Sequence, residues 1–330
     1  ALTTPEKKAV LPDLWSSLFM ITPVISTTFA SMDRMLADLP ADSLGWLLID
    51  EAGQATPQSA VGGLIRSRRA VIVGDPIQIP PVVTLPDTLT DAVQRHFGVD
   101  PDRFNAPVAS AQTLADASTA YTAEFSTGAG TRAVGVPLLV HRRCAEPMFG
   151  IANAVAYDRQ MVQAKRSAPS PIGDVLGPSR WIEVDGDATE KWSPEEGEKT
   201  VLLLSALRER GVTPDLFIVP PFVVVKDGLR RAILESRVLH DWVTDPGKWV
   251  QDRVGTVHTV QGREAEAVIF VLGAPLAQQR GARGWAGGQP NLLNVAITRA
   301  QERLYVVGSR KVWREAGVFA ELARRLGGQG

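Results

Sequence analysis

Two adjacent carboxylates, Asp50 and Glu51, directly follow the apolar run at residues 46–49. Open α/β sheets bind ligands at the carboxyl ends of their parallel strands, so these side chains stand where a binding site is expected. An Asp at such a position can hold Mg²⁺ beside a nucleotide, and a neighbouring Glu can orient or deprotonate an attacking water. Taken alone, the segment fits equally well a strand that runs into a solvated turn.

A second apolar run with a polar end follows at residues 71–81, VIVGDPIQIPP. Gly74 permits close approach of the backbone to a ligand. Gln78 carries both a donor and an acceptor, which suits it to contact a phosphate or the water that attacks it. The two segments are about one strand–helix unit apart, and together they favour a binding site over a proline-rich turn.

Arginines end two later segments. Residues 138–144 finish a short apolar run with Arg142 and Arg143, and residues 291–300 place Arg299 on an expected helix before a strand. Arginines supplied across a domain interface can stabilise the charge on a phosphoryl group during its transfer. We expect Arg142 to be an ordinary surface ion-pair residue.

Small hydroxyl residues lie between these arginines, in residues 254–264, VGTVHTVQGRE. Hydroxyl and backbone N–H groups contact phosphate oxygens without reading bases. Glu264 has the chemistry to accept hydrogen bonds from ribose hydroxyls. No second His or Cys stands at metal-ligand spacing from His258, which argues against a metal role for it.

Short apolar runs alternate with helical stretches along the chain, which predicts an α/β fold with a mainly parallel sheet. The expected strands are residues 21–27, 46–49, 70–73, 216–219, 253–257, 267–272 and 303–307. Residues 84–135 are interpreted as an inserted helical segment, with a helix at 87–97 before Gly98, and residues 165–193 as an irregular excursion. Ser193 to Glu196 has the pattern of a capping box for a helix that ends at Gly211.

Composition bounds the class of protein. The 330 residues suggest two domains of roughly 150 residues each. The 35 basic and 36 acidic residues exclude binding of nucleic acid by bulk positive charge, so any such contact must come from a local track of donors. The single Cys144 excludes an internal disulfide, and the apolar runs fall short of the ~18 residues of a membrane span. The first residues lack the apolar stretch of a signal peptide, which favours a cytoplasmic location.

These segments, in this order, resemble motifs II, III, IV, V and VI of superfamily 1 helicases. The resemblance is strongest to the branch that includes the nonsense-mediated-decay helicases and their bacterial relatives, and residues 22–29 resemble that branch's motif Ic. It extends over about residues 20–325, and several ordered matches are far more specific than any one of them.

The resemblance implies two RecA-like domains of the P-loop NTPase type with mainly parallel sheets, the first one incomplete. Residues 1–135 would form the partial first domain, with the helical insertion at 84–135, and residues 136–330 the second. The implied roles are Asp50 for Mg²⁺, Glu51 as catalytic base, Gln78 as γ-phosphate sensor, Arg143 and Arg299 facing the phosphates, Gly74, Asp75, Gly262 and Glu264 at the nucleotide, and Thr27, Thr28, Thr256, His258 and Thr259 along the nucleic acid. The resemblance also implies that Asp50 and Glu51 face Arg143 and Arg299 across a cleft.

The function implied is the motor part of an ATP-dependent DNA or RNA helicase or translocase with 5′→3′ polarity, bacterial and cytoplasmic, whose partner is single-stranded DNA or RNA. The alternative is a non-catalytic module of the same fold that binds nucleic acid or protein. A nuclease is a third option, but Glu183, Asp185 and Asp187 lie beside Gly186 and fit a solvated turn.

The phosphate-binding signature G-x-x-x-x-G-K-[ST] does not occur in the 330 residues. Residues 128–131 lack the lysine, and residues 197–200 lack a glycine directly before it. In the family this loop precedes motif Ic, so we expect an upstream segment of the same protein, or a partner chain, to supply it. The 330 residues alone are then expected to hydrolyse negligible ATP. Residues 219–223 resemble motif IVa, but Val223 and Val224 stand where relatives carry a polar or basic residue.

Overall fold

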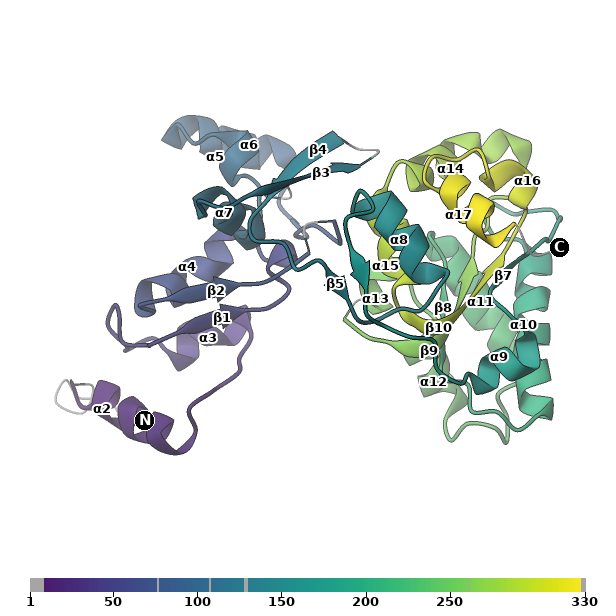
Figure 1. Cartoon of the computed structure of the whole chain (residues 1–330), viewed down its shortest axis with the longest axis horizontal. Coiled ribbons are helices and arrows are strands. Elements are labelled where there is room, and N and C mark those ends of the chain that lie inside the picture. The colour runs from purple at the N-terminus through teal and green to yellow at the C-terminus, as the bar shows by residue number, and fades with distance from the viewer. Residues whose placement is uncertain (1–8, 76, 107, 128–129, 261, 328–330) are drawn as a thin grey trace. The chain divides into compact units, whose positions relative to one another are not determined.

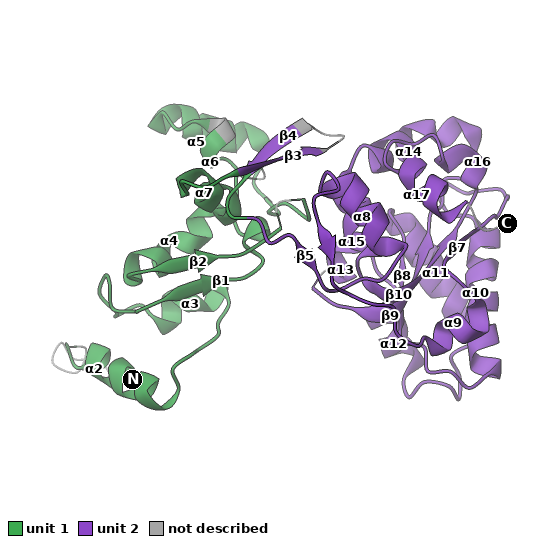
Figure 2. Cartoon of the chain, in the orientation of Figure 1, with its two compact units in different colours: residues 1–122, 134–136 green, residues 123–133, 137–330 purple. Residues whose placement is uncertain are grey.

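The chain divides into two compact units in the computed structural model, which describes residues 9–75, 77–106, 108–127, 130–260 and 262–327 (Figure 1). Unit 1 comprises Ala1–Thr122 and Val134–Val136, and unit 2 comprises Ala123–Ala133 and Pro137–Gly330 (Figure 2). The chain therefore passes between the units three times, whereas a single boundary between residues 135 and 136 is expected from the sequence. Residues 123–133, which that division assigns to the first domain, are grouped with unit 2.

Unit 1 is built on two parallel strands, β1 (Leu47–Ile49) and β2 (Ala70–Ile72), with Ile49 opposite Ile72. Its helices are α2 (Leu11–Ile21), α3 (Phe29–Met35), η1 (Ala52–Gln54), α4 (Pro57–Arg66), α5 (Asp87–Phe97), α6 (Pro101–Phe104) and α7 (Ala111–Ser118). The sheet is poorly covered, because Leu48 is 71% exposed and Val71 is 41% exposed. Strands of this composition are normally buried, so the sheet of unit 1 leaves apolar side chains exposed that other elements would ordinarily cover.

The core of unit 1 consists of two small clusters. One contains Ile49, Ala52 and Ala111, with Phe29 packed against it, and joins the end of β1 to α7. The other contains Met32, Leu36 and Leu39 and lies on α3 and the turn after it. The predicted helix at 87–97 is confirmed as α5, and Gly98 ends it with a left-handed φ of 62°.

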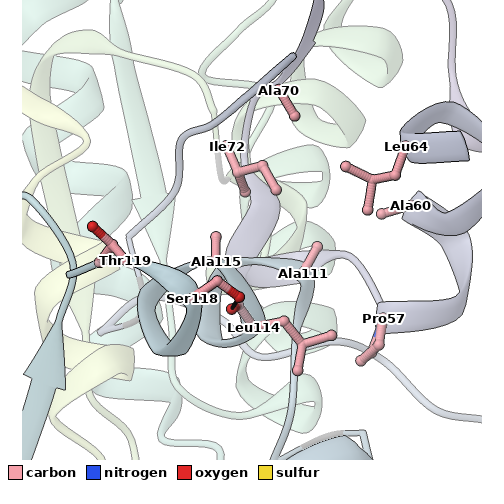
Figure 3. Close-up of a pocket in the computed structure, with 10 residues that line it drawn as sticks. All are labelled: Pro57, Ala60, Leu64, Ala70, Ile72, Ala111, Leu114, Ala115, Ser118 and Thr119. Atoms are coloured by element: carbon pink, nitrogen blue, oxygen red, sulfur yellow. Dashed lines mark hydrogen bonds between the residues drawn. The ribbon is translucent and has the colours of Figure 1, made fainter. Parts of the chain in front are cut away.

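A cleft of about 510 Å³ lies between α4, β2 and α7 (Figure 3). Leu64, Ile72 and Leu114 are among the side chains that line it, and none of the ten residues drawn there is charged. The only polar side chains drawn there are the hydroxyls of Ser118 and Thr119, and a site without positive charge is unsuited to a triphosphate. The cleft is therefore a gap in packing beside α7 and not a candidate phosphate site.

Unit 2 contains a four-stranded parallel sheet in the order β7, β10, β9, β8. These strands are β7 (Arg180–Ile182), β8 (Leu216–Val219), β9 (Ala265–Val271) and β10 (Ala300–Val307). Every residue of β8 is buried, as are all but one of β9, as expected for strands covered on both faces. The predicted fold class, α/β with mainly parallel sheets, is confirmed.

Helices cover this sheet, and two short strand pairs lie outside it. The helices are α8 (Met148–Ala156), α9 (Pro171–Leu176), α10 (Pro194–Glu209), α11 (Val223–Glu235), α12 (Pro246–Arg253), α13 (Val257–Val260), η2 (Ala277–Gln279), α14 (Arg280–Gly287), α15 (Pro290–Ile297), α16 (Arg310–Trp313) and α17 (Phe319–Leu326). The pairs are β3 (Ala123–Thr127) with β4 (Gly130–Val134), and β5 (Val140–His141) with β6 (Val162–Gln163).

Two predicted strands are wrong. At residues 21–27, α2 ends at Ile21 and the following residues form neither helix nor strand up to α3. Pro23 has no N–H for a strand ladder, which disfavours a paired strand there. At residues 253–257, α12 ends at Arg253 and Val254 makes only an isolated bridge to Ile218 before α13 begins.

Two further expectations need correction. The irregular stretch 165–193 contains helix α9 and edge strand β7. The helix α10 ends as predicted, because Gly211 adopts a φ of 65°, but its start is not a capping box. The Ser193 hydroxyl donates to Glu195 Oε2 at 2.8 Å, and Glu196 turns inward to accept the Gly273 N–H at 2.7 Å. A tertiary contact thus replaces the local cap.

Candidate functional site

The two polar turns of unit 1 lie side by side at the carboxyl edge of its sheet. Asp50 and Glu51 follow β1, while Gly74 and Asp75 come one residue after β2. The Ala52 N–H donates to the Val73 carbonyl at 2.9 Å, and this bond extends the pairing of the strands into the turns. The parallel register therefore positions both groups of side chains together.

The acidic turn has a constrained backbone. Glu51 is left-handed, with a φ of 53°, which costs a non-glycine residue of order 1 kcal/mol or more. Its N–H donates to Asp50 Oδ1 at 2.9 Å, and its Oε2 accepts from Gln54 Nε2 at 3.1 Å. Asp50 is exposed and Glu51 half-buried. An exposed carboxylate beside an oriented one suits a cation held mainly by phosphate oxygens and a positioned water.

The turn after β2 is organised by the carboxylate of Asp75. Its Oδ1 accepts the Ile77 N–H at 2.9 Å, and its Oδ2 accepts from Gln78 Nε2 at 3.0 Å. A Cβ on Gly74 would lie 2.7 Å from the Gly53 nitrogen and 2.9 Å from the Ala52 nitrogen, so the turn requires glycine. Pro76 lies outside the described residues.

The predicted nucleic-acid residues of unit 1 stand at the start of α3. Thr27 and Thr28 are exposed, and the Thr28 hydroxyl is directed at Ser31 Oγ, 3.4 Å away. Phe29 packs against the cluster that contains Ile49 and Ala52. This packing places the start of α3, which directly follows the two threonines, against the cluster at the end of β1.

In unit 2 the structure brings together Arg143, Glu264 and Gln301. Arg143 Nε donates to Glu264 Oε1 at 2.5 Å, and Gln301 Nε2 donates to Glu264 Oε2 at 2.8 Å. Partial burial alone would raise the pKa of the Glu264 carboxyl, but the Gln301 hydrogen bond and the charge of Arg143 outweigh it and hold this pKa below its ordinary value. Glu264 therefore stays ionised, and it orients the Arg143 guanidinium.

Arg299 is buried, with only 1% of its surface exposed. It lies between α15 and β10, and its donors reach Val295 O at 3.1 Å and Arg263 O at 3.1 Å. A third donor reaches Thr298 Oγ1 at 3.2 Å. In this structure the guanidinium is thus directed into unit 2, and it holds the backbone of the residue that precedes Glu264.

The remaining predicted residues of unit 2 lie around α13. The Thr259 hydroxyl donates to Thr256 O at 2.8 Å, while His258 and Thr259 are both exposed. Gly262 has a φ of 74°, the left-handed region that favours glycine. Gln261 lies outside the described residues. The hydroxyl and imidazole groups are accessible to a ligand on this face of unit 2.

The structure therefore places the predicted residues in two sets. Unit 1 holds Thr27, Thr28, Asp50, Glu51, Gly74, Asp75 and Gln78, and unit 2 holds Arg143, Thr256, His258, Thr259, Gly262, Glu264 and Arg299. Sequence reasoning missed Gln301, which follows the Thr298–Arg299–Ala300 segment and whose amide shares Glu264 with Arg143. It also missed Gln112 and Asp116, because nothing in the sequence connects α7 to the turns.

Within the described part of the chain, no group of three or more His, Cys, Asp or Glu side chains is arranged to hold a metal ion. A Mg²⁺ ion bound with ATP needs only one or two protein carboxylates, since phosphates and water supply the other oxygens. Asp50 fits that donor chemistry. Among the described helices, none has the length and apolar character needed to cross a membrane.

The chain is similar to three curated helicase and DNA-binding proteins. It is 23% identical to the DNA replication ATP-dependent helicase/nuclease JHS1 of Arabidopsis thaliana, over 91% of this chain and 21% of that protein. It is 23% identical to the DNA replication ATP-dependent helicase/nuclease DNA2 of Gallus gallus, over 88% and 25%. It is 24% identical to the DNA-binding protein SMUBP-2 of Rattus norvegicus, over 88% and 27%. The chain thus spans about a quarter of the length of these relatives.

Two solved structures are also similar, an arterivirus nonstructural protein 10 helicase in complex with DNA and the PRRSV helicase. The first is 14% identical over 82% of this chain and 41% of that chain, with a TM-score of 0.36. The second is 12% identical over 80% and 35%, with a TM-score of 0.37. Scores this low add no support of their own.

Two family models, each described as an AAA domain, match the chain in succession. One matches residues 15–85 and so includes both polar turns of unit 1. The other matches residues 137–311, which contain Arg143, Glu264 and Arg299. This second match covers more than half of the 330 residues, and the chain therefore belongs to the AAA domain family.

Proposed function

We propose that this chain is the motor-domain part of an ATP-dependent helicase or translocase that moves 5′→3′ on single-stranded DNA or RNA. The observation that carries the proposal is the pairing of the Asp50–Glu51 turn with the Gly74–Gln78 turn at the carboxyl edge of a parallel sheet. The Arg143–Glu264–Gln301 group in the second unit supports it. Two of the three relatives are named as helicases and the third as a DNA-binding protein, which agrees with this proposal.

In this proposal the two sets of side chains serve one nucleotide. Bound Mg²⁺ would neutralise phosphate charge, and Asp50 is the side chain that would hold it. Glu51, already oriented by Gln54, positions and deprotonates the attacking water, and Gln78 contacts the γ-phosphate. Arg143 presents its charge to the phosphates from the second unit, and Glu264 fixes its direction.

Nucleic acid is held through its backbone in this proposal. Thr27 and Thr28 in unit 1, and Thr256, His258 and Thr259 in unit 2, offer hydroxyl and imidazole groups at or near exposed ends of elements. Contacts of this kind bind phosphate and sugar without sequence preference. Val223, which is 59% exposed, offers no polar group where relatives carry one, so a contact is missing at the start of α11.

The phosphate-binding loop is proposed to come from an upstream segment of the same protein or from a partner chain. Two features support this: the 330 residues lack the signature, and the sheet of unit 1 exposes Leu48 and Val71. A further strand together with the helix that follows it would cover such residues, because crossover helices pack on the faces of a parallel sheet. The bacterial and cytoplasmic assignments stay predictions.

The proposal is tested with Glu51→Gln in the complete protein. ATP turnover stimulated by single strands should fall by at least about a hundredfold, the usual scale for loss of a general base, while ATP binding persists. Steady-state turnover and equilibrium ATP binding check this. Loss of binding together with turnover would show that Glu51 has a different role.

The matched control concerns the isolated chain. The 330 residues alone should show negligible Mg²⁺-dependent ATP hydrolysis, because no phosphate-binding loop is present in them. Robust turnover by the purified 330-residue chain would overturn the proposal that the loop is supplied from elsewhere.

One observation favours the alternative, a non-catalytic module that binds nucleic acid or protein. The Arg299 donors are engaged with Val295, Arg263 and Thr298 inside unit 2. A guanidinium whose donors are engaged inside unit 2 in this way is not directed at a transferring phosphoryl group. If the complete protein binds single strands without any ATP turnover, this alternative holds and the motor proposal fails.

A further inference from the structure

Helix α7 packs directly against the acidic turn of unit 1. The Ala111 N–H at its start donates to Ala55 O at 2.9 Å, and Ala111 belongs to the same cluster as Ile49 and Ala52. A capping box formed by Ser110 and Thr113 stabilises the N-terminus of the helix. Its N-terminal turn is therefore fixed relative to the residues that follow β1.

Gln112, on the first turn of α7, reaches the second polar turn. Its side chain is buried, with 7% exposed, and its Oε1 lies 3.0 Å from the place that a Cβ on Gly74 would occupy. That oxygen has no hydrogen-bond partner. A buried amide oxygen without a donor is costly, so it is ready to accept an N–H that moves toward it.

The other end of the same amide is attached to Asp116. Gln112 Nε2 donates to Asp116 Oδ1 at 3.0 Å, and both residues are 7% exposed. The same Oδ1 also accepts the Gly135 N–H at 2.9 Å. This carboxylate oxygen thus links Gln112 to Gly135, which lies nineteen positions beyond Asp116, while Asp116 Oδ2 is buried without a partner.

Gly135 has a special place in the connectivity. It belongs to Val134–Val136, the short stretch of unit 1 between Ala133 and Pro137, which both belong to unit 2. A Cβ at Gly135 would lie 2.9 Å from Asp116 Oδ1 and 3.0 Å from Thr119 Cγ2. Only glycine permits this approach, and the approach attaches the connecting segment to α7.

We propose that Gln112 and Asp116 are positioning residues that couple the Gly74 turn to the connecting segment 134–136. The proposal rests on the function above, in which the nucleotide binds at that turn. A displacement of Gly74 by bound nucleotide moves the Gln112 amide, and that amide helps to hold the same Asp116 oxygen that accepts the Gly135 N–H. The state of the nucleotide site thereby changes the hold of unit 1 on the segment that leads into unit 2.

The packing beside α7 permits such a displacement. Ala111, Leu114, Ala115 and Ser118 line the uncharged cleft between α7, α4 and β2, as Figure 3 shows. A helix with open space along one side can shift without compressing a packed core. The coupling is therefore a small movement of α7. Gln112 and Asp116 move with the helix, and Asp116 transmits the movement to the Gly135 N–H.

Hydrogen exchange of the Gly135 amide tests the coupling in the 330-residue chain without nucleotide. Asp116→Ala should speed this exchange by about tenfold, the upper range for losing one hydrogen bond. Asp116→Asn keeps the acceptor oxygen and should stay within about threefold of the original chain. Gln112→Ala should speed exchange by roughly threefold although Gln112 does not touch Gly135.

The matched control is Ser118→Ala, on the same helix, whose hydroxyl donates only to Leu114 O at 2.6 Å on an exposed face. It should leave Gly135 exchange unchanged. Unchanged exchange in Gln112→Ala would overturn the coupling, and unchanged exchange in Asp116→Ala would overturn the attachment of the segment. If Asp116→Ala does not fold, Gln112→Ala and Asp116→Asn decide the question.

Kinetics of the complete protein separate this proposal from the function beneath it. Asp116→Ala should lower kcat by about tenfold with the KM for ATP within about twofold, since neither residue reaches the nucleotide, and Asp116→Asn should restore the rate. An unchanged kcat despite faster Gly135 exchange refutes the coupling while the motor function stands. An inactive complete protein refutes the motor function, and the exchange result still decides whether the residues are coupled.

Discussion

Glu196 shows most clearly how a single buried group sets a property of the whole chain. It is fully buried on α10, its Oε2 accepts the Gly273 N–H, and its Oε1 has no partner. Burial raises the pKa of this carboxyl from 4.5 to about 8, and the hydrogen bond from Gly273 only partly opposes this. The folded chain therefore holds this proton at neutral pH, where the unfolded chain releases it.

This proton makes stability depend on pH. Between 4.5 and about 8 the folded state binds more protons than the unfolded state, so the contribution of Glu196 to the free energy of unfolding falls as pH rises. Glu196→Gln, which cannot ionise, should remove a loss on the order of 5 kcal/mol across that window. Urea midpoints measured near both ends of the window check this; equal slopes for the two chains would contradict it.

At the residue scale, sequence reasoning found groups whose position depends on one strand end. Asp50, Glu51 and Gly74 lie where their strands predict, because a parallel register brings carboxyl ends together. It did not foresee the orientation of Arg299 or Glu196. Ser193 and Glu196 match the pattern of a local capping box, but the Glu196 side chain instead accepts the N–H of Gly273, 77 residues away. Such a choice depends on tertiary burial, which local spacing does not encode.

At the element scale, two helical glycines of unit 2 have opposite roles. Gly228 lies inside α11, and a Cβ there would overlap the indole of Trp192. Gly284 lies inside α14, and a Cβ there would meet nothing within 4 Å. The two positions share a helical backbone and differ in what packs against them.

Alanine at these positions should therefore have effects of opposite sign. Gly228→Ala should lower the free energy of unfolding by about 1–3 kcal/mol through overpacking, more than the gain in helix propensity returns. Gly284→Ala should raise it by roughly 0.5–1 kcal/mol, because only the propensity changes. Chemical denaturation of both variants measures this. Stabilisation by Gly228→Ala would mean that Trp192 moves aside freely.

Strands were predictable from the sequence where the apolar run was continuous. Strands β8, β9 and β10 were located to within three residues at each end, because a strand buried on both faces leaves an unbroken apolar signal. The two-residue strands β5 and β6 pair across more than twenty positions, and that pairing has no local signature. The segment 21–27 contains the apolar residues Ile21, Val24 and Ile25, but Pro23 has no N–H for the ladder that this pattern suggests.

At the scale of the whole molecule, the two units differ in how their sheets are protected. Strands β8, β9 and β10 of unit 2 are mostly buried among helices, whereas β1 and β2 are a pair with exposed side chains and two small clusters beside them. The α/β class follows from the alternation of runs in the sequence. The unequal cores do not follow from it, because burial of β1 and β2 depends on what else pairs with them.

Hydrogen exchange should reveal this difference directly. Backbone amides of β1 and β2 should exchange at least about a hundredfold faster than those of β9, since local opening of a sparsely packed pair needs less free energy than opening a central strand. Peptide-resolved exchange on the 330-residue chain measures both in one experiment. Equal protection in the two sheets would show that unit 1 is stabilised by contacts other than its own core.

The threefold passage of the chain between the units has a practical meaning for evolution and for protein engineering. A polypeptide that stops at Thr122 lacks Gly135 and its bond to Asp116, while one that continues to Val136 takes along the β3–β4 pair that is grouped with the other unit. No single junction yields two intact halves. A gene fusion or recombination junction inside residues 122–137 is therefore expected to break at least one of the two units.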